Sequence, residues 1–185
     1  YPIGYFYGYK TAGVFQNWSQ VEGTAAKYAG AQPGDLIFVD SNNDGKITED
    51  DRTMIGNPNP DFSMGLNLNF SYKGFDLNVA GAGSFGKQIA KSYRSFADSP
   101  LQNYTTDIFG RWTGEGTSNK LPRLTSGSHT NWQNISDIYI EDGDYLKIQN
   151  LTIGYDFKKL FPTMPLGQAR LYLTAQNLFT FTGYS

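Results

Sequence analysis

The stretch FSMGLNLNFSYKGFDLNVAGAGSF, residues 62–85, decides the fold class. Over residues 62–72, apolar side chains alternate with small or polar ones without a break. This period of two places the apolar and polar side chains on opposite faces of a β-strand. Lys73 and Gly74 then form a tight turn, and the alternation resumes with Phe75, Leu77 and Val79 against Asp76, Asn78 and Ala80. The stretch therefore predicts an antiparallel hairpin with one apolar face.

A second hairpin is expected over residues 144–182, with a turn that contains Pro and Gly at 158–167. Its apolar face is expected to carry Leu151, Ile153, Tyr155, Phe157, Leu171, Leu173, Ala175, Phe179 and Phe181. Strands of about 9–11 residues with one apolar face are typical of membrane barrels, although a β-sandwich with one solvated face gives the same local pattern. Aromatic side chains near the strand ends favour the barrel, because they suit the two membrane interfaces.

The composition narrows the possible functions. The 185 residues include 13 Tyr, 13 Phe and 21 Gly but no Cys, which favours strands and tight turns and leaves no disulfide or thiolate site. A formal net charge of −2 argues against nucleic-acid binding, which needs a basic face. No apolar run reaches the roughly 20 residues of a transmembrane helix. The mean hydropathy of −0.46 is compatible with barrel strands, whose apolar and polar residues average out.

The remaining segments are expected to be extended or irregular. Residues 1–16 read as extended, residues 21–28 as a short helix, and residues 36–39 as a short apolar strand. Residues 87–143 form a long polar loop, which suits the extracellular side of a barrel. Four aromatic residues in that loop are expected to pack in a loop core, the alternative being that they stack on sugar rings: Tyr93, Tyr104, Trp112 and Trp132.

Residues 40–51 fit the twelve-position calcium loop. Side-chain oxygens converge at positions 1, 3 and 5, a Gly makes the turn at 6, a backbone carbonyl is offered at 7, and position 12 is Asp rather than Glu. The shorter side chain predicts weaker calcium binding. The expected ligands are Asp40, Asn42, Asp44, the Lys46 carbonyl, Thr48 and Asp51. The alternative is a solvated turn without an ion, because the flanks are not the helices of an EF-hand.

Patterns that could indicate an enzyme are better explained by structure. Gly81, Gly83 and Gly86 form a G-x-G-x-x-G pattern before residues 87–97, which are expected to be helical. The preceding strand alternates, however, whereas a nucleotide-binding strand is buried on both faces. His129 stands alone in a polar loop and is expected to be solvated. Three carboxylates around Gly143 are expected to be solvated turn residues rather than a glycosidase pair: Glu141, Asp142 and Asp144. We therefore expect no catalytic residues and no enzyme activity.

Four ordered motifs carry a family resemblance. They are DSNNDGKITEDDRTMIGNPNPDF followed by GLNLNFSYKGFDLNV (from Asp40), RWTGEGTSNKLPRL (from Arg111), IEDGDYLKIQNLTIGYDF (from Ile140) and RLYLTAQNLFTFTGYS (from Arg170). Together they resemble the C-terminal barrel region of SusC/RagA-type TonB-dependent transporters. The matches cover most of residues 34–185, and the first thirty residues match only loosely.

The resemblance implies an all-β fold: an antiparallel transmembrane β-barrel segment with long extracellular loops, in the outer membrane. It implies that residues 1–185 are part of one barrel domain, with the N-terminal plug and the TonB-contacting part absent from this sequence. The implied function is import of oligosaccharides or peptides with a SusD-like surface lipoprotein and the TonB complex. The alternative is a soluble, calcium-stabilised β-sandwich that binds carbohydrate. Since the sequence begins at Tyr1 without a signal sequence, we expect a processed protein or a piece of a longer one.

Overall fold

The computed structural model describes residues 1–91, 106–125 and 129–184. The chain divides into two compact units. One, called here the loop unit, comprises Tyr1–Pro58 and Ile89–Glu141, and the other, the sheet unit, comprises Asn59–Gln88 and Asp142–Ser185.

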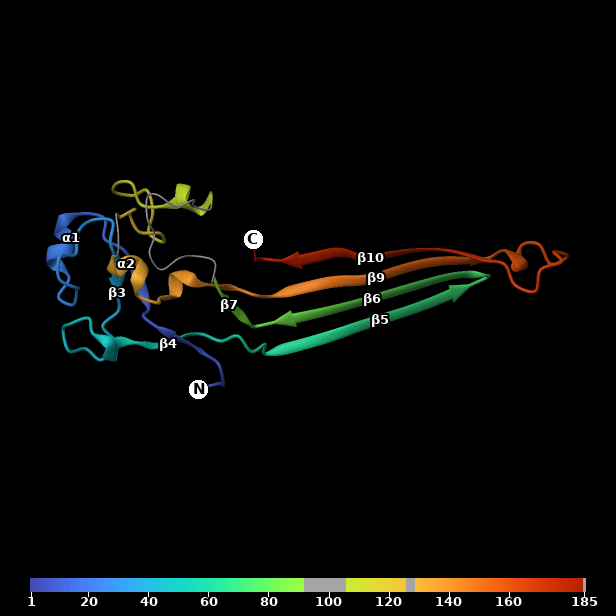
Figure 1. Ribbon diagram of the computed structural model, residues 1–185, viewed down its shortest axis with the longest axis horizontal. Coiled ribbons are helices and arrows are strands. Elements are labelled where there is room, and N and C mark those ends of the chain that lie inside the picture. Colours follow the sequence, from blue (N-terminus) through green and yellow to red (C-terminus); the bar gives the residue numbers. More distant parts are fainter. Residues whose placement is uncertain (92–105, 126–128, 185) are drawn as a thin grey trace. The chain divides into compact units, whose positions relative to one another are not determined.

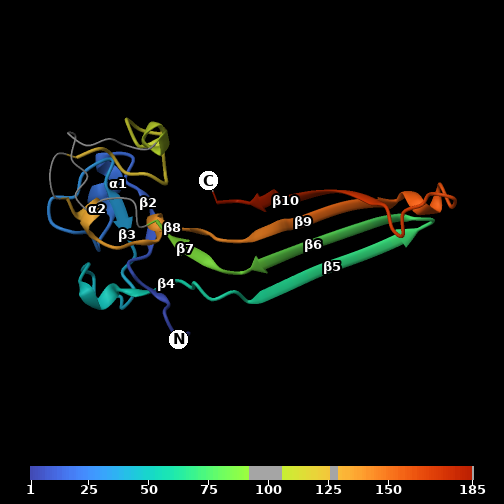
Figure 2. The same ribbon diagram turned by 45° about the vertical axis from the view of Figure 1, so that its right-hand side comes forward.

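The sheet unit is a four-stranded antiparallel sheet in the order β10-β9-β6-β5 (Figure 1, Figure 2). The strands are β5 (Phe62–Tyr72), β6 (Phe75–Phe85), β9 (Tyr145–Asp156) and β10 (Arg170–Thr182). Both expected hairpins are present. The turn between β5 and β6 places Lys73 and Gly74 at positive φ, 49° and 91°. Two successive positive φ values are the signature of the type I′ turn, whose twist matches that of the flanking strands.

The register aligns the apolar residues of all four strands on one face. Tyr72 pairs with Phe75, which pairs with Tyr155, which pairs with Leu171, and the next rows repeat this pattern. Residues paired in this way lie on the same face of the sheet. The alternate rows are polar, and one of them runs through Asn69, Asn78, Thr152 and Thr174.

Two irregularities in the register extend the apolar face beyond the sequence prediction. The pairing of β6 with β9 shifts after Ala80, so that one extra residue of β9 brings Ile148 opposite Gly81 and Leu146 opposite Gly83. The shift moves two even-numbered residues onto the face of the odd-numbered ones. The pairing of β9 with β10 shifts between Gln176 and Phe179, where Asn177 has φ 54°. Simple alternation missed Leu146 and Ile148 because it assumes an unbroken period of two.

Gly154 of β9 makes room for an ion pair on the polar face. The guanidinium of Arg170 donates through Nε to Asp76 Oδ1 at 3.0 Å and through Nη2 to Asp76 Oδ2. A Cβ at Gly154 would lie 2.6 Å from Asp76 Oδ1 and 2.9 Å from Arg170 Nη2. The absent side chain therefore lets β6 and β10 join across β9.

The loop unit contains short paired strands and short helices. β1 (Phe6–Gly8) pairs with β4 (Thr53–Gly56), β2 (Thr11–Val14) with β3 (Leu36–Phe38), and β7 (Gln88–Ala90) with β8 (Ile140–Asp142). The helices are α1 (Trp18–Gly23) and α2 (Thr130–Gln133), and the 3₁₀ turns are η1 (Glu49–Asp51), η2 (Thr106–Gly110) and η3 (Asp137–Tyr139). A further turn, η4 (Phe157–Lys159), follows β9 in the sheet unit.

The core of the loop unit surrounds Trp132, whose side chain is 1% exposed. Around it pack Tyr9, Val14, Leu36, Phe38, Ile138 and Tyr139, with Trp112 partly buried against them. The expectation that Trp112 and Trp132 pack is therefore confirmed, whereas Tyr93 and Tyr104 lie outside the described residues.

Several details differ from the sequence expectations. α1 begins earlier than expected because the Asn17 side chain accepts a hydrogen bond from the Gln20 N–H and caps the helix. The helix expected over residues 87–97 is wrong where the structure describes it, since Gln88–Ala90 is a strand. The fold is all-β in character, and the four long strands form an open sheet rather than a closed barrel. Among the described residues, no helix is both long and apolar enough to cross a membrane.

Candidate functional site

The loop of residues 40–51 is organised by hydrogen bonds from backbone N–H groups to its own side chains. Asp40 accepts from the Asp44 N–H at 3.2 Å and from the Gly45 N–H at 2.8 Å. Asn42 Oδ1 accepts from the Asp44 N–H, and Asp44 Oδ1 from the Lys46 N–H at 2.8 Å. The chain thus curls around three oxygen-bearing side chains. Each carboxylate oxygen keeps a second lone pair for another partner.

The expected ligands at positions 9 and 12 have a structural role. Thr48 and Asp51 form a capping box around η1, in which each side chain accepts from a backbone N–H near the other. Asp51 is fully buried and also accepts from the Ser41 N–H at 2.9 Å. Burial raises the pKa of the Asp51 carboxyl, but N–H groups of Thr48, Ser41 and Asn42 outweigh it and hold this pKa below its ordinary value. In the described residues, no three Asp, Glu or His side chains are grouped to hold a metal ion.

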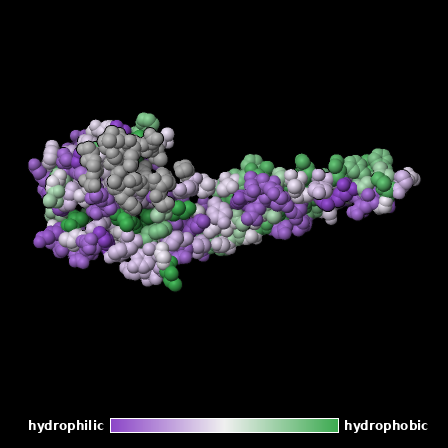
Figure 3. All heavy atoms as spheres, viewed as in Figure 1, coloured by the Kyte–Doolittle hydropathy of each residue, from purple (hydrophilic) through white to green (hydrophobic). Residues whose placement is uncertain are grey.

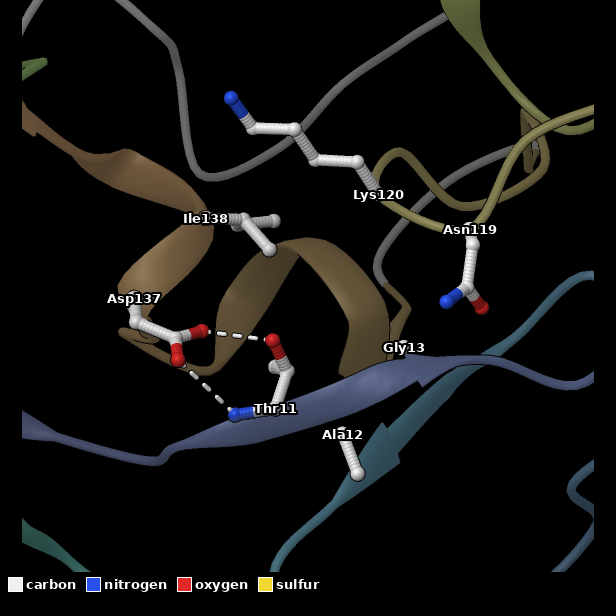
Figure 4. Close-up of a pocket in the computed structure, with 7 residues that line it drawn as sticks. All are labelled: Thr11, Ala12, Gly13, Asn119, Lys120, Asp137 and Ile138. Atoms are coloured by element: carbon white, nitrogen blue, oxygen red, sulfur yellow. Dashed lines mark hydrogen bonds between the residues drawn. The ribbon is translucent and has the colours of Figure 1, made fainter.

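A polar cleft of about 350 Å³ lies between β2, η3 and the loop at Asn119 (Figure 4). The Asp137 carboxylate accepts from the Thr11 backbone N–H at 3.1 Å and from the Thr11 hydroxyl at 2.6 Å. Asn119 Oδ1 accepts from the Val14 N–H at 3.1 Å. These groups fasten segments far apart in the sequence, and Lys120 adds an exposed ammonium at the rim. The Asp137 and Asn119 side chains of the cleft therefore serve to hold the loops to β2.

A buried carboxylate, Asp35, joins its own turn to two other segments of the loop unit. Its Oδ1 accepts from Arg123 Nε at 2.7 Å and from Asn131 Nδ2 at 2.9 Å, and its Oδ2 accepts from the Gln32 N–H at 3.0 Å. Asp35 is 0% exposed, and so is Asn131. Sequence reasoning missed this cluster because its members are 88 and 96 residues apart. The arrangement leaves the charge of Asp35 paired rather than available for catalysis.

His129 is not the solvated residue expected. It precedes α2, where its Nδ1 accepts from the Asn131 N–H at 3.2 Å and caps the helix. Its Nε2 lies 3.4 Å from Arg123 Nη2 and 4.0 Å from Asp35 Oδ1. Burial lowers the pKa of the imidazole, Asp35 raises it and Arg123 lowers it again, and the sum is a pKa below the ordinary value. His129 is therefore a neutral cap.

The other patterns that could indicate an enzyme also have structural roles. Gly81 and Gly83 lie inside β6, and Gly86 follows it with φ 79°, so the glycines belong to a strand and its exit. Glu141 forms an ion pair with Lys91. Asp144 accepts from the Gly86 and Lys87 N–H groups, and Asp142 accepts from the Asp144 N–H.

The apolar face of the sheet unit is exposed to an extent unusual for a folded protein. Leu173 is 74% exposed, Leu171 68% and Phe181 60%, and apolar residues of β5 are exposed as well. Figure 3 shows hydrophobic and hydrophilic side chains together on the surface of this unit. A continuous apolar face without cover indicates an apolar environment or a partner surface.

The chain resembles several TonB-dependent receptors. It is 37% identical over 183 residues to the TonB-dependent receptor P3 of Formosa agariphila, a match that covers 98% of this chain and 18% of that receptor. It is 28% identical over 155 residues to the TonB-dependent receptor SusC of Bacteroides thetaiotaomicron, covering 83% of this chain and 15% of SusC. No protein-family model matches the chain.

Solved structures show the same fold. A chain of the RagAB peptide transporter superposes with a TM-score of 0.66 at 23% identity, covering 97% of this chain and 19% of that chain. The RagAB peptide importer in its open-open state gives a TM-score of 0.63. This chain spans about a fifth of the length of these relatives or less. Its sequence motifs, its sheet and its relatives agree, and the chain belongs to the SusC/RagA-like TonB-dependent receptors.

Proposed function

We propose that this chain supplies membrane-spanning strands and outer loops to a β-barrel importer in the outer membrane. The observation that carries the proposal is the four-stranded sheet with one exposed apolar face. Exposing this face to water would cost free energy, at roughly 25 cal/mol for each Å² of apolar surface. In a bilayer the same face is favourable, and the backbone polar groups between the strands are already paired. The relatives are named as receptors and importers, which supports this setting.

The length of the strands supports membrane crossing. They contain 11 to 13 residues. At a rise of roughly 3.4 Å per residue they extend roughly 37–44 Å. A strand tilted by about 45° needs roughly 35 Å to cross an apolar band of about 25 Å. The strands are therefore long enough to cross with their ends in the interfaces.

The polar face suits the lumen of such a barrel. Asn67, Asn69 and Asn78 form a connected ladder of side-chain amides, with Asn67 Oδ1 accepting from Asn78 Nδ2 at 3.2 Å and from Asn69 Nδ2 at 3.3 Å. Neutral amides and hydroxyls offer both donors and acceptors to a passing polar solute. The proposed cargo is an oligosaccharide or a peptide, delivered with a SusD-like surface lipoprotein and driven through the TonB complex. The proposed role is non-catalytic.

The soluble carbohydrate-binding sandwich receives no support from the relatives. In a sandwich the apolar face of each sheet is buried against the other. Here Leu171 and Leu173 are mostly exposed.

We also propose that residues 40–51 bind calcium weakly, as a structural ion. Asp40, Asn42 and Asp44 are held on the inside of one turn by the backbone hydrogen bonds described above, and each keeps a lone pair. The capping role of Asp51 competes with ligation and is the reason to expect low affinity.

A matched pair of lysine substitutions in the full-length receptor tests the membrane proposal. Leu68→Lys places a charge on the apolar face, and Asn69→Lys places the same charge on the polar face one residue later. A cation on the lipid face near the midplane costs roughly 2–4 kcal/mol. We expect Leu68→Lys to lower the amount of folded receptor in the outer-membrane fraction severalfold and Asn69→Lys to leave it unchanged. Equal tolerance of the two variants would count against the proposal.

Uptake is tested separately in a strain that lacks the chromosomal receptor gene. Growth on oligosaccharides or on peptides as the sole source is compared with and without the restored gene. Co-purification of a lipoprotein with the restored receptor tests the proposed partner. If the strain grows equally well with and without the gene on both nutrient classes, the proposed cargo is ruled out.

A further inference from the structure

A groove lies in the apolar face of the sheet, at the end where both hairpin turns lie. Because β9 lies between β6 and β10, Ile153 and Tyr155 of β9 form its floor. Phe75 of β6 borders one side, and Leu171 and Leu173 of β10 border the other. The groove has a volume of about 340 Å³. This volume lies at the lower end of the roughly 300–1,000 Å³ of small-molecule pockets.

The lining of the groove suits an alkyl chain. No charged side chain lines it. The polar side-chain groups of its lining are the hydroxyls of Tyr155 and Tyr172, so a polar ligand would lose most of its hydrogen bonds to water there without replacing them. Phe157 and Tyr155 stand edge to face, with ring centroids 5.3 Å apart, at the end of the groove nearest the turns. Aromatic rings of this kind are enriched where the apolar layer of a membrane meets its headgroups.

The turn end of the sheet is basic. Lys158 and Lys159 of η4 directly follow Phe157 of the groove. The stem of Lys159 lies over the β5–β6 turn, with its Cβ 3.0 Å from the position of a Cβ on Gly74. Lys158 Nζ donates to the Gly167 carbonyl at 2.9 Å, which leaves two of its three N–H groups for other acceptors.

The opposite end of the sheet unit has the reverse charge. Acidic residues there outnumber basic ones, with Asp61, Asp142 and Asp144 against Lys87 and Lys147. At the turn end, Lys73, Lys158, Lys159 and Arg170 outnumber Asp76 and Asp156. An anionic headgroup is therefore favoured at the turn end over the opposite end.

We propose that the groove binds one acyl chain of an anionic glycerophospholipid, whose phosphate accepts hydrogen bonds from Lys158 and Lys159. In membrane barrels the short turns lie on the periplasmic side, so the lipid belongs to the inner leaflet of the outer membrane. Ammonium-to-phosphate hydrogen bonds are charge-assisted and stronger than neutral ones. The inference rests on the proposed membrane location of the sheet.

The test measures lipids retained by the full-length receptor. The receptor is placed in nanodiscs of phosphatidylglycerol or phosphatidylcholine, released, and weighed by native mass spectrometry. Leu173→Trp fills the groove with an apolar side chain, and Leu66→Trp is its control on the apolar face of β5. Lys158→Gln with Lys159→Gln removes the basic pair, and Lys87→Gln is the control at the other end of the sheet.

We expect the parent receptor to retain phosphatidylglycerol in preference to phosphatidylcholine. Leu173→Trp should abolish retention, and the double lysine variant should weaken phosphatidylglycerol binding by about fivefold for each lysine. The two controls should retain lipid as the parent does. Retention that is unchanged in Leu173→Trp or equal for both lipids would overturn the proposal. A receptor absent from the outer-membrane fraction would instead refute the proposed function, which separates the two failures.

Discussion

Asp35→Ala is expected to loosen the loop unit and leave the sheet unit unchanged. The substitution removes the acceptor of Arg123 and Asn131 and leaves the Nδ2 group of Asn131, which is fully buried, without its acceptor. Removing one member of a buried ion pair costs roughly 3–5 kcal/mol. The Arg123 side chain is 23% exposed and regains some hydration, so we expect the lower end, about 3 kcal/mol. At about 1.4 kcal/mol for each factor of ten, local opening becomes about a hundredfold more frequent.

Hydrogen–deuterium exchange of the full-length receptor measures this opening. Peptides that cover β2 and β3 should lose protection by about two orders of magnitude, because the Leu36 N–H itself donates to Asn131 Oδ1. Peptides from β9 should exchange as in the parent. Glu22→Ala removes an exposed carboxylate of the same unit and is the matched control.

Two results would refute the reasoning about Asp35. Unchanged exchange in β2 and β3 would show that the cluster contributes little to the stability of the loop unit. An equal loss in β9 would show that the variant unfolds the whole receptor and that Asp35 does not act locally. Asp35→Asn provides a graded case, since it keeps an acceptor for Asn131 but removes the charge opposite Arg123.

Three further outcomes are expected. Because the fold lowers the pKa of His129, the stabilisation from its cap is complete above the unfolded pKa of about 6.5 and is lost as the pH falls below that value. Hydrogen–deuterium exchange in α2, corrected for intrinsic rates, should therefore rise from pH 7 to pH 5. The substitution His129→Asn, which keeps a capping side chain that does not titrate, should remove this rise. Gly154→Ala should lower the melting temperature of the receptor by displacing the Asp76–Arg170 pair, whereas Gly167→Ala, in open space, should not. Calcium at about 100 times its Kd should stabilise residues 40–51 against hydrogen–deuterium exchange by roughly 2.7 kcal/mol relative to the protein in chelator. The substitution Asp44→Ala should abolish this stabilisation. Equal exchange of the parent in calcium and in chelator would exclude the ion.

The sheet unit was predictable because its information is local. Alternation between Phe62 and Tyr72 needs no knowledge of distant residues, and Lys73-Gly74 marks the turn by itself. The prediction fell short where a bulge changes the period, at Leu146 and Ile148. Nothing near those two residues signals an extra residue in the pairing.

The loop unit was less predictable because its stabilising contacts are long-range. Asp35 meets Arg123 across 88 positions, and Thr11 meets Asp137 across 126. A lone polar residue such as His129 looks solvated until its distant neighbours are known. The calcium pattern was read from local spacing alone. Spacing could not reveal that Asp51, the twelfth residue of the loop, caps η1.

The two units place their apolar residues by opposite rules, and this explains the moderate hydropathy of the whole. In the loop unit Trp132 and Leu36 are buried, at 1% exposure each, as in a protein folded in water. In the sheet unit Leu173 and Phe181 are exposed, and the amides of the polar face bond to one another. The effect of a polar substitution therefore depends on solvent as well as on burial. Leu36→Asn should destabilise the loop unit in any solvent, because it buries a polar side chain. Leu173→Asn should cost little free energy where the face is exposed to water and should destabilise the sheet in a bilayer.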